Sequence, residues 1–121
     1  MSRSVLVGMA ATAAAFAFVS AAWADNTAGM VGNTAVCTAP DGNQTKVYVE
    51  PGGRFTLRLP DGSTTKGAVK DDGSQICYTE TSPASDAAPV CTPSVARSVG
   101  DTWTVDARGA TQNCSLQSGK Q

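Results

Sequence analysis

The sequence predicts an all-β protein, an antiparallel meander of about eight short strands that forms a small barrel or sandwich stapled by disulfides. The first observation is that apolar residues recur at every second position between Gln44 and Glu80, the period of a half-buried strand. The second is that glycine turns separate these runs, at Pro51-Gly52-Gly53, Pro60-Asp61-Gly62 and Asp71-Asp72-Gly73. The third is the lack of helical periodicity after residue 24.

Residues 1–24 have the pattern of a signal peptide. Arg3 supplies the positive charge, Val5 to Val19 is apolar, and Ala22-Trp23-Ala24 matches a cleavage site before Asp25. A membrane anchor is the alternative, but the interrupted apolar stretch is short for a span of about 20 residues. We therefore expect a periplasmic or secreted protein with no membrane span after cleavage.

Cleavage would leave 97 residues, which is the length of one small domain. We expect a flexible N-terminal arm at 25–33, a single β domain at 34–117 and a polar tail at 118–121. The mature chain has 8 basic and 10 acidic residues, a net charge of −2. It lacks the basic face that nucleic-acid binding requires, so we expect no nucleic-acid partner.

Turn signals divide the β domain into short runs about ten residues apart. Closing such a meander into a barrel would remove exposed strand edges, although a flattened sandwich stays open as an alternative. The Pro-, Ala- and Ser-rich segment Thr81 to Pro89 is expected to be a flexible surface loop. The expected strands are 34–38, 44–50, 54–60, 63–69, 74–80, 90–95, 102–106 and 111–116.

The second and third strands have a preferred register. If residues 51–53 form a three-residue hairpin loop, Glu50 lies opposite Arg54, and apolar residues face apolar residues on the other side of the sheet. The same register places Lys46 opposite Arg58, a pair of like charges. We interpret this pair mainly as two solvated side chains, with an anion-binding spot as the less favoured alternative.

The four cysteines indicate two disulfides, because their number is even and export places them in an oxidising compartment. Metal binding is disfavoured because no two cysteines have CxxC spacing and the chain has no histidine. Three connectivities are compatible with the sequence. We prefer Cys77–Cys91, across the flexible loop, and Cys37–Cys114, between the first strand and the last.

The sequence does not indicate an enzyme. Without histidine, the usual general base and the Ser–His and Cys–His nucleophile pairs are missing. Several aspartates adjoin turn glycines, where capping of the backbone explains them, and Asp71-Asp72-Gly73 and Asp41-Gly42-Asn43 do not resemble a calcium-binding loop. We therefore predict no catalytic residue, no cofactor and no metal site.

Aromatic residues could form either the core or a contact surface. Phe55, Tyr78 and Trp103 are assigned to the core, because a small domain has few aromatic residues to fill its interior. Tyr48 alternates with the apolar positions of its strand and is therefore expected on the exposed face. With Lys46 and Arg58, it is the candidate for a surface contact.

Part of the mature chain resembles small exported bacterial proteins of unassigned function. The shared pattern is an aromatic residue after a glycine turn, an Asp-Gly turn, a Gly-plus-aromatic strand, a second Asp-Gly turn and a cysteine. The sequence departs from it at Gly67-Ala68-Val69, where an aromatic residue is more common, which implies a smaller core there. The matching segments are Gly53-Arg54-Phe55, Pro60-Asp61-Gly62, Asp72-Gly73, Ile76-Cys77-Tyr78 and Gly100-Asp101-Thr102-Trp103.

We expect a non-catalytic function, as a binding or structural protein of the bacterial periplasm. Its partner is expected to be an unknown protein or envelope component, and the protein is expected to be a monomer. The alternative is a protease inhibitor acting through its N-terminal arm. It follows from a looser likeness to periplasmic metalloprotease-inhibitor β-barrels, which use such an arm. A third hypothesis is a small-ligand carrier with its site inside the barrel, which a completely packed interior would exclude.

Overall fold

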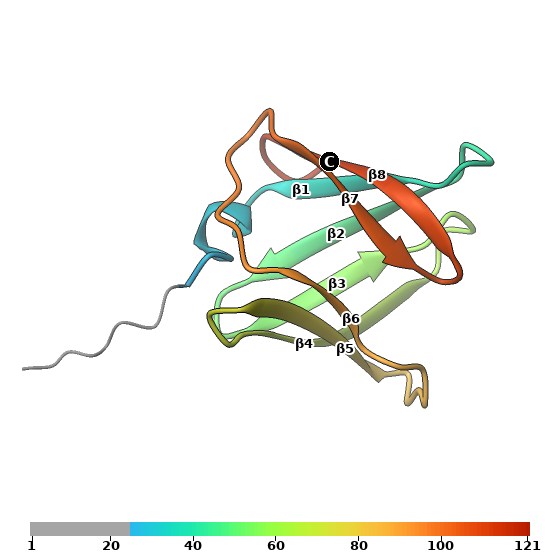
Figure 1. Cartoon of the computed structure of the whole chain (residues 1–121). Coiled ribbons are helices and arrows are strands. Elements are labelled where there is room, and N and C mark those ends of the chain that lie inside the picture. Colours follow the sequence, from blue (N-terminus) through green and yellow to red (C-terminus); the bar gives the residue numbers. More distant parts are fainter. Residues whose placement is uncertain (1–24) are drawn as a thin grey trace, which may run out of the picture.

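The computed structural model describes residues 25–121, so the expected signal peptide lies outside the described residues. One short 3-10 helix, η2 (Ala28–Met30), precedes eight strands (Figure 1). The strands confirm the all-β prediction, and their ends differ from the expected ends by only a few residues. They are β1 (Thr34–Thr38), β2 (Gln44–Glu50), β3 (Arg54–Arg58), β4 (Thr64–Asp71), β5 (Gln75–Ser82), β6 (Val90–Pro93), β7 (Thr102–Ala107) and β8 (Ala110–Gln117).

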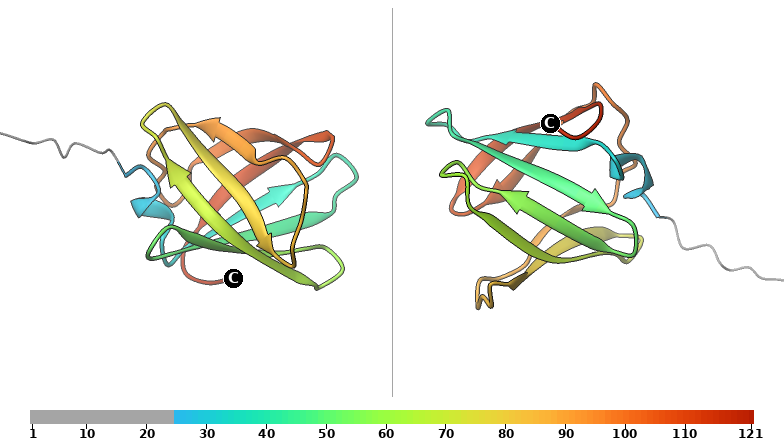
Figure 2. Two further views of the ribbon diagram at one scale, coloured as in Figure 1. Left: turned by 90° about the horizontal axis from the view of Figure 1, so that it is seen from below. Right: turned by 180° about the vertical axis from the view of Figure 1, so that it is seen from behind.

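All eight strands belong to one antiparallel sheet with the order β6-β5-β4-β3-β2-β1-β8-β7. The sheet curls until its two edge strands, β6 and β7, face each other, which makes a nearly closed barrel (Figure 2). No ladder of hydrogen bonds joins β6 to β7. We call this opening between the edge strands the seam. The alternative of two packed sheets is thereby excluded.

The pairing of β2 with β3 is the one expected from the sequence. Glu50 lies opposite Arg54, Val49 opposite Phe55, and Lys46 opposite Arg58. The loop between the strands turns on Gly52 and Gly53, whose φ angles of 87° and 74° are positive. Such angles strain any residue with a Cβ, which explains why glycine occupies both positions.

Inward-facing apolar side chains form the core at one end of the barrel. Phe55 is 1% exposed and lies opposite Gly67, and its ring meets Tyr78 edge-on with centroids 5.4 Å apart. Gly67 leaves space for that ring, which is the physical reason for the small residue at this point of the pattern. The buried core residues are Met30, Ala35, Val49, Phe55, Val69, Ile76 and Leu116.

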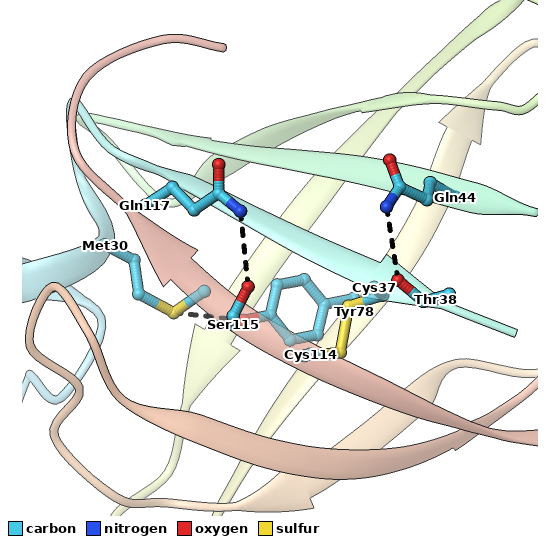
Figure 3. The surroundings of a disulfide bond; sticks show 8 residues. All are labelled: Met30, Cys37, Thr38, Gln44, Tyr78, Cys114, Ser115 and Gln117. Atoms are coloured by element: carbon cyan, nitrogen blue, oxygen red, sulfur yellow. Dashed lines mark hydrogen bonds between the residues drawn. A yellow bond between two sulfur atoms is a disulfide. The ribbon is translucent and has the colours of Figure 1, made fainter. Parts of the chain in front are cut away.

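Both preferred disulfides are present. Cys37 in β1 and Cys114 in β8 are direct partners across the sheet, and so are Cys77 in β5 and Cys91 in β6. The first bridge lies in the interior near Tyr78 and Met30 (Figure 3). The second fastens the edge strand β6, which is only four residues long, to its neighbour.

The segment expected to be a flexible N-terminal arm is docked on the barrel. Met30 is 4% exposed within the core, and the backbone N–H of Asn26 donates a hydrogen bond of 2.8 Å to the Asp71 carboxylate. A side chain at Gly29 would overlap the backbone oxygen of Arg97, so this turn lies directly against the chain beside it. Burial of Met30 and the Asn26–Asp71 hydrogen bond therefore anchor a segment whose small, polar composition suggested a loose arm.

Candidate functional site

The barrel contains a partly open cavity of about 90 Å³. It exists because several inward positions carry small side chains, among them Ala35, Thr45 and Ala107, so the larger apolar residues do not fill the interior. Most of the lining is apolar. The larger apolar residues of the lining include Val47, Phe55, Leu57, Ile76, Val90, Trp103 and Val105.

At the end of the barrel that η2 covers, the cavity has two polar groups. The guanidinium of Arg97 lies over the ring of Trp103, with Cζ 4.5 Å from the centroid. The hydroxyl of Tyr78 points to the Met30 sulfur at 3.6 Å, and a thioether is a weak acceptor (Figure 3). Burial raises the pKa of Tyr78 to about 12 despite the opposing effect of the Arg97 charge, so the phenol is neutral at physiological pH.

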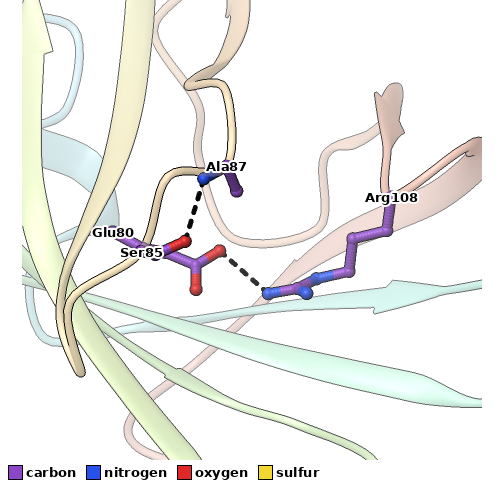
Figure 4. A network of polar contacts seen from close by, with 4 residues as sticks. All are labelled: Glu80, Ser85, Ala87 and Arg108. Atoms are coloured by element: carbon purple, nitrogen blue, oxygen red, sulfur yellow. Dashed lines mark hydrogen bonds and ion pairs between the residues drawn. The ribbon is translucent and has the colours of Figure 1, made fainter.

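At the opposite end, an ion pair crosses the seam. Arg108 donates a hydrogen bond of 2.9 Å to Glu80, and so joins the β7–β8 turn to β5 (Figure 4). The turn residues Arg108 and Gly109 both have positive φ, as the two-residue turn of a tight hairpin requires. This pair is the only salt bridge found within residues 25–121. Because its side chains are partly exposed, we assign it a modest contribution to stability.

Gln112 is the most deeply buried polar residue of the cavity lining. It is 7% exposed, and it lines the cavity. A side-chain amide that lines a cavity can donate hydrogen bonds to, and accept them from, a bound molecule or water.

The period of two along β5 and β8 could have predicted the polar residues of the cavity lining, but our sequence analysis did not use it for them. Glu80 is in phase with Ile76 and Tyr78, and Gln112 is in phase with Cys114, so both polar residues fall on inward faces. The sequence interpretation treated Glu80 as an acid without a partner and Arg108 only as a turn residue. Arg97 lies outside the regular strands, where alternation gives no information about its direction.

The expectation that Tyr48 is exposed is wrong. The residue does point to the outer face of β2, but the C-terminal tail covers it and leaves it 7% exposed. Its hydroxyl donates a hydrogen bond of 2.7 Å to the backbone oxygen of Gln121, and the Lys120 ammonium lies 5.0 Å from the ring centroid. The Thr34 hydroxyl also holds the tail, because it donates a hydrogen bond to the backbone oxygen of Gly119 and accepts one from the backbone N–H of Gln121.

The other two candidates for a surface contact lie on the same face of the sheet as Tyr48. Lys46 and Arg58 are register partners on β2 and β3, with Lys46 half-buried and Arg58 exposed. Neither is in an ion pair within residues 25–121. Tyr48 is covered and so is not available for a contact, while a contact through Lys46 and Arg58 stays a prediction.

The carboxylates beside the turn glycines cap their own turns. Asp61 accepts hydrogen bonds from the backbone and side chain of Ser63, and Asp72 accepts them from the backbones of Ser74 and Gln75. These hydrogen bonds lower the pKa of both carboxyl groups. No cluster of three potential metal ligands is found within residues 25–121.

Asp71 has a different role, as the link between the N-terminal segment and the barrel. Desolvation tends to raise its pKa, but hydrogen bonds from the Asn26 and Gly73 backbones and from the Ser94 hydroxyl outweigh this effect and lower it. Ser94 in turn accepts a hydrogen bond from the Asn26 side chain. The carboxylate thus connects three segments of the chain.

No protein family, curated protein or solved structure is found to match this chain. The resemblances noted from sequence motifs therefore stay predictions. Within residues 25–121, no helix has the length and apolar character needed to cross a membrane.

Proposed function

We propose that this protein is an exported, non-catalytic binding protein of the bacterial envelope that holds a small apolar molecule inside its barrel. The observation that carries the proposal is the cavity of about 90 Å³ with its largely apolar lining. An eight-stranded barrel is wide enough either to be filled by side chains or to hold one small ligand. The space left here favours the second use.

The character of the lining supports a ligand with an apolar body. A cavity of about 150 Å³ lined by apolar side chains stays free of water and accepts benzene, so the smaller cavity of about 90 Å³ suits about four or five carbon atoms. The side-chain amide of Gln112 adds a polar group that such a ligand could contact. The expected signal peptide and the two disulfides support export, because disulfides persist in oxidising compartments.

The seam provides a route into the cavity. Moving β6 away from β7 disrupts no ladder of strand hydrogen bonds, because these two strands are the edges of the sheet. The Cys77–Cys91 disulfide keeps β6 attached to β5. A ligand would therefore enter by a small separation of the β5–β6 pair from β7, with release of the Glu80–Arg108 ion pair.

The test is a titration of the purified protein with pentan-1-ol, followed by NMR of valine and leucine methyl groups. At about 0.8 kcal/mol per buried carbon, five carbons give about 4 kcal/mol, equivalent to a Kd of about 1 mM. The methyl groups of Val47, Leu57 and Val105, which line the cavity, should shift together. Shifts confined to the outer surface, or their absence, would refute the proposal.

Two variants of one strand provide a matched control. Val105→Phe places a large ring in the cavity, whereas Thr104→Phe places the same ring on the exposed outer face of β7. We expect the first to abolish pentan-1-ol binding and the second to leave it within about twofold. The dispersed methyl spectrum of each variant reports whether it is folded.

The alternative function, inhibition of a protease through the N-terminal arm, has less support. Met30 and the Asn26–Asp71 hydrogen bond hold this segment on the barrel, so it would have to detach before entering a protease cleft. If removal of residues 25–32 leaves a measured inhibition unchanged, that function is excluded.

A further inference from the structure

Arg97 is the cavity residue whose charge is not balanced. The other two charged residues of the lining, Glu80 and Arg108, neutralise each other in an ion pair. Arg97 is half-buried, and within residues 25–121 no carboxylate forms a salt bridge with it. An apolar cavity with one unbalanced positive charge favours a negatively charged ligand over a neutral one.

The contact with Trp103 holds the guanidinium of Arg97 at the cavity wall. Cζ of Arg97 lies 4.5 Å from the centroid of the indole ring, a distance at which a cation is attracted to the ring. The five N–H donors of a guanidinium lie in one plane. This planar fork matches the two oxygens of a carboxylate, which can accept two parallel hydrogen bonds. Because Trp103 also lines the cavity, the contact holds Arg97 beside the ligand space.

A second donor lies at the same end of the cavity. Tyr78 presents a neutral hydroxyl whose present acceptor is the Met30 sulfur at 3.6 Å. An oxygen of a bound carboxylate would be a stronger acceptor than a thioether, so the hydroxyl would turn toward it. The two donors come from different parts of the chain, since Tyr78 is in β5 and Arg97 is in the segment between β6 and β7.

We propose that the ligand is a small organic monocarboxylate whose carboxylate pairs with the guanidinium of Arg97 and whose apolar body fills the cavity. This inference rests on the proposed function, because it names the class of ligand for the same site. The apolar body would extend from Arg97 past Val105 and Leu57 toward Gln112. Binding would remove the charge imbalance of the cavity.

The experiment compares pentanoate with pentan-1-ol, which share a five-carbon chain and differ in charge. Both are titrated at pH 7 and low ionic strength into the wild-type protein, Arg97→Met and Arg58→Met. Methionine retains much of the apolar stem of arginine, and Arg58 is an exposed arginine that does not line the cavity. We expect pentanoate to bind about tenfold more tightly than pentan-1-ol to the wild type, as charge-assisted hydrogen bonds imply.

In Arg97→Met, pentanoate affinity should fall about tenfold while pentan-1-ol affinity stays within about threefold, and Arg58→Met should change neither. Arg97→Lys keeps the charge and should retain an intermediate affinity for pentanoate, which provides a second variant if Arg97→Met does not fold. Tyr78→Phe should weaken pentanoate binding by about threefold and leave pentan-1-ol binding unchanged.

The two proposals fail in different ways. If pentan-1-ol binds inside the barrel but pentanoate binds no more tightly, or if Arg97→Met weakens both equally, the monocarboxylate inference is wrong and the proposed function stands. If neither compound shifts the cavity methyl groups, the barrel does not bind small apolar molecules and both proposals are refuted.

Discussion

Replacing Gly67 by alanine should destabilise the barrel strongly, because the position has no room for a methyl group. A Cβ built on Gly67 would lie 2.7 Å and 2.8 Å from two carbons of the Phe55 ring and would overlap the backbone oxygen of Thr79. The ring is 1% exposed at the centre of the core, and the carbonyl belongs to the paired strand β5. Neither group can move without disturbing the interior or the β4–β5 pairing.

The magnitude follows from three contributions. Overpacking a core costs about 1–3 kcal/mol. Displacing one strand hydrogen bond costs about 1 kcal/mol. The reduced freedom of the unfolded chain returns about 0.5–1 kcal/mol. We therefore expect Gly67→Ala to lower the free energy of unfolding by about 2–3 kcal/mol, which is about 10–15 °C in Tm for a domain of this length.

Thermal and urea unfolding followed by circular dichroism would measure this change, with Gly62→Ala as the control. Gly62 has a positive φ of 88° and no atom near its Cβ position, so its replacement costs only backbone strain, about 1 kcal/mol. Phe55→Leu should then relieve part of the crowding and show a favourable coupling with Gly67→Ala in a double-mutant cycle. Equal effects of the two glycine substitutions would refute the crowding argument.

Three further predictions concern the contacts that hold the barrel together. The disulfide between β1 and β8 spans 77 residues, and that between β5 and β6 spans 14. Chain entropy therefore predicts that replacing each pair by alanines lowers the free energy of unfolding by about 4.5 and about 3 kcal/mol, respectively. Urea unfolding that gives the reverse order would contradict this prediction. Asp71 has a lowered pKa in the folded state, so its contribution to stability is present above an unfolded pKa of about 3.9 and is lost as pH falls through the folded value. Asp71→Asn should therefore flatten the pH dependence of Tm below about pH 5. If Tm falls with decreasing pH as steeply in the variant as in the wild type, the Asp71 carboxylate does not stabilise the fold in this way. Tyr48→Phe should lower the free energy of unfolding by about 1 kcal/mol through loss of the hydrogen bond to Gln121, and it should have no effect in a chain that lacks residues 118–121.

The strands and their pairing could be predicted because both depend on local patterns. Alternation identifies which residues share a face, and the turn residues determine where each strand ends. The β2–β3 register followed from matching apolar and charged partners across a loop of three residues. The disulfides could be predicted with the same logic, since each joins positions that the expected strand order brings together.

The candidate site was less predictable because its members come from separate segments. Arg97 lies over Trp103 only when the segment after β6 crosses the seam, and a pattern of alternation contains no information about that path. The cavity depends on the combined size of all inward side chains around the closed barrel, which no single strand reveals. Glu80 and Gln112 could have been assigned to the interior from their phase, although their roles there could not.

The sequence by itself determined the fold class, the strand boundaries, one hairpin register and the preferred disulfides, because these depend on backbone period, turn conformation and near neighbours. Only the tertiary structure decided that the barrel is nearly closed and that it leaves space inside. It also decided that the N-terminal segment and the C-terminal tail pack against the barrel. Met30 and the residues that cover Tyr48 reach partners far along the chain. Such contacts depend on the path of the whole chain, so residue type and spacing alone do not specify them.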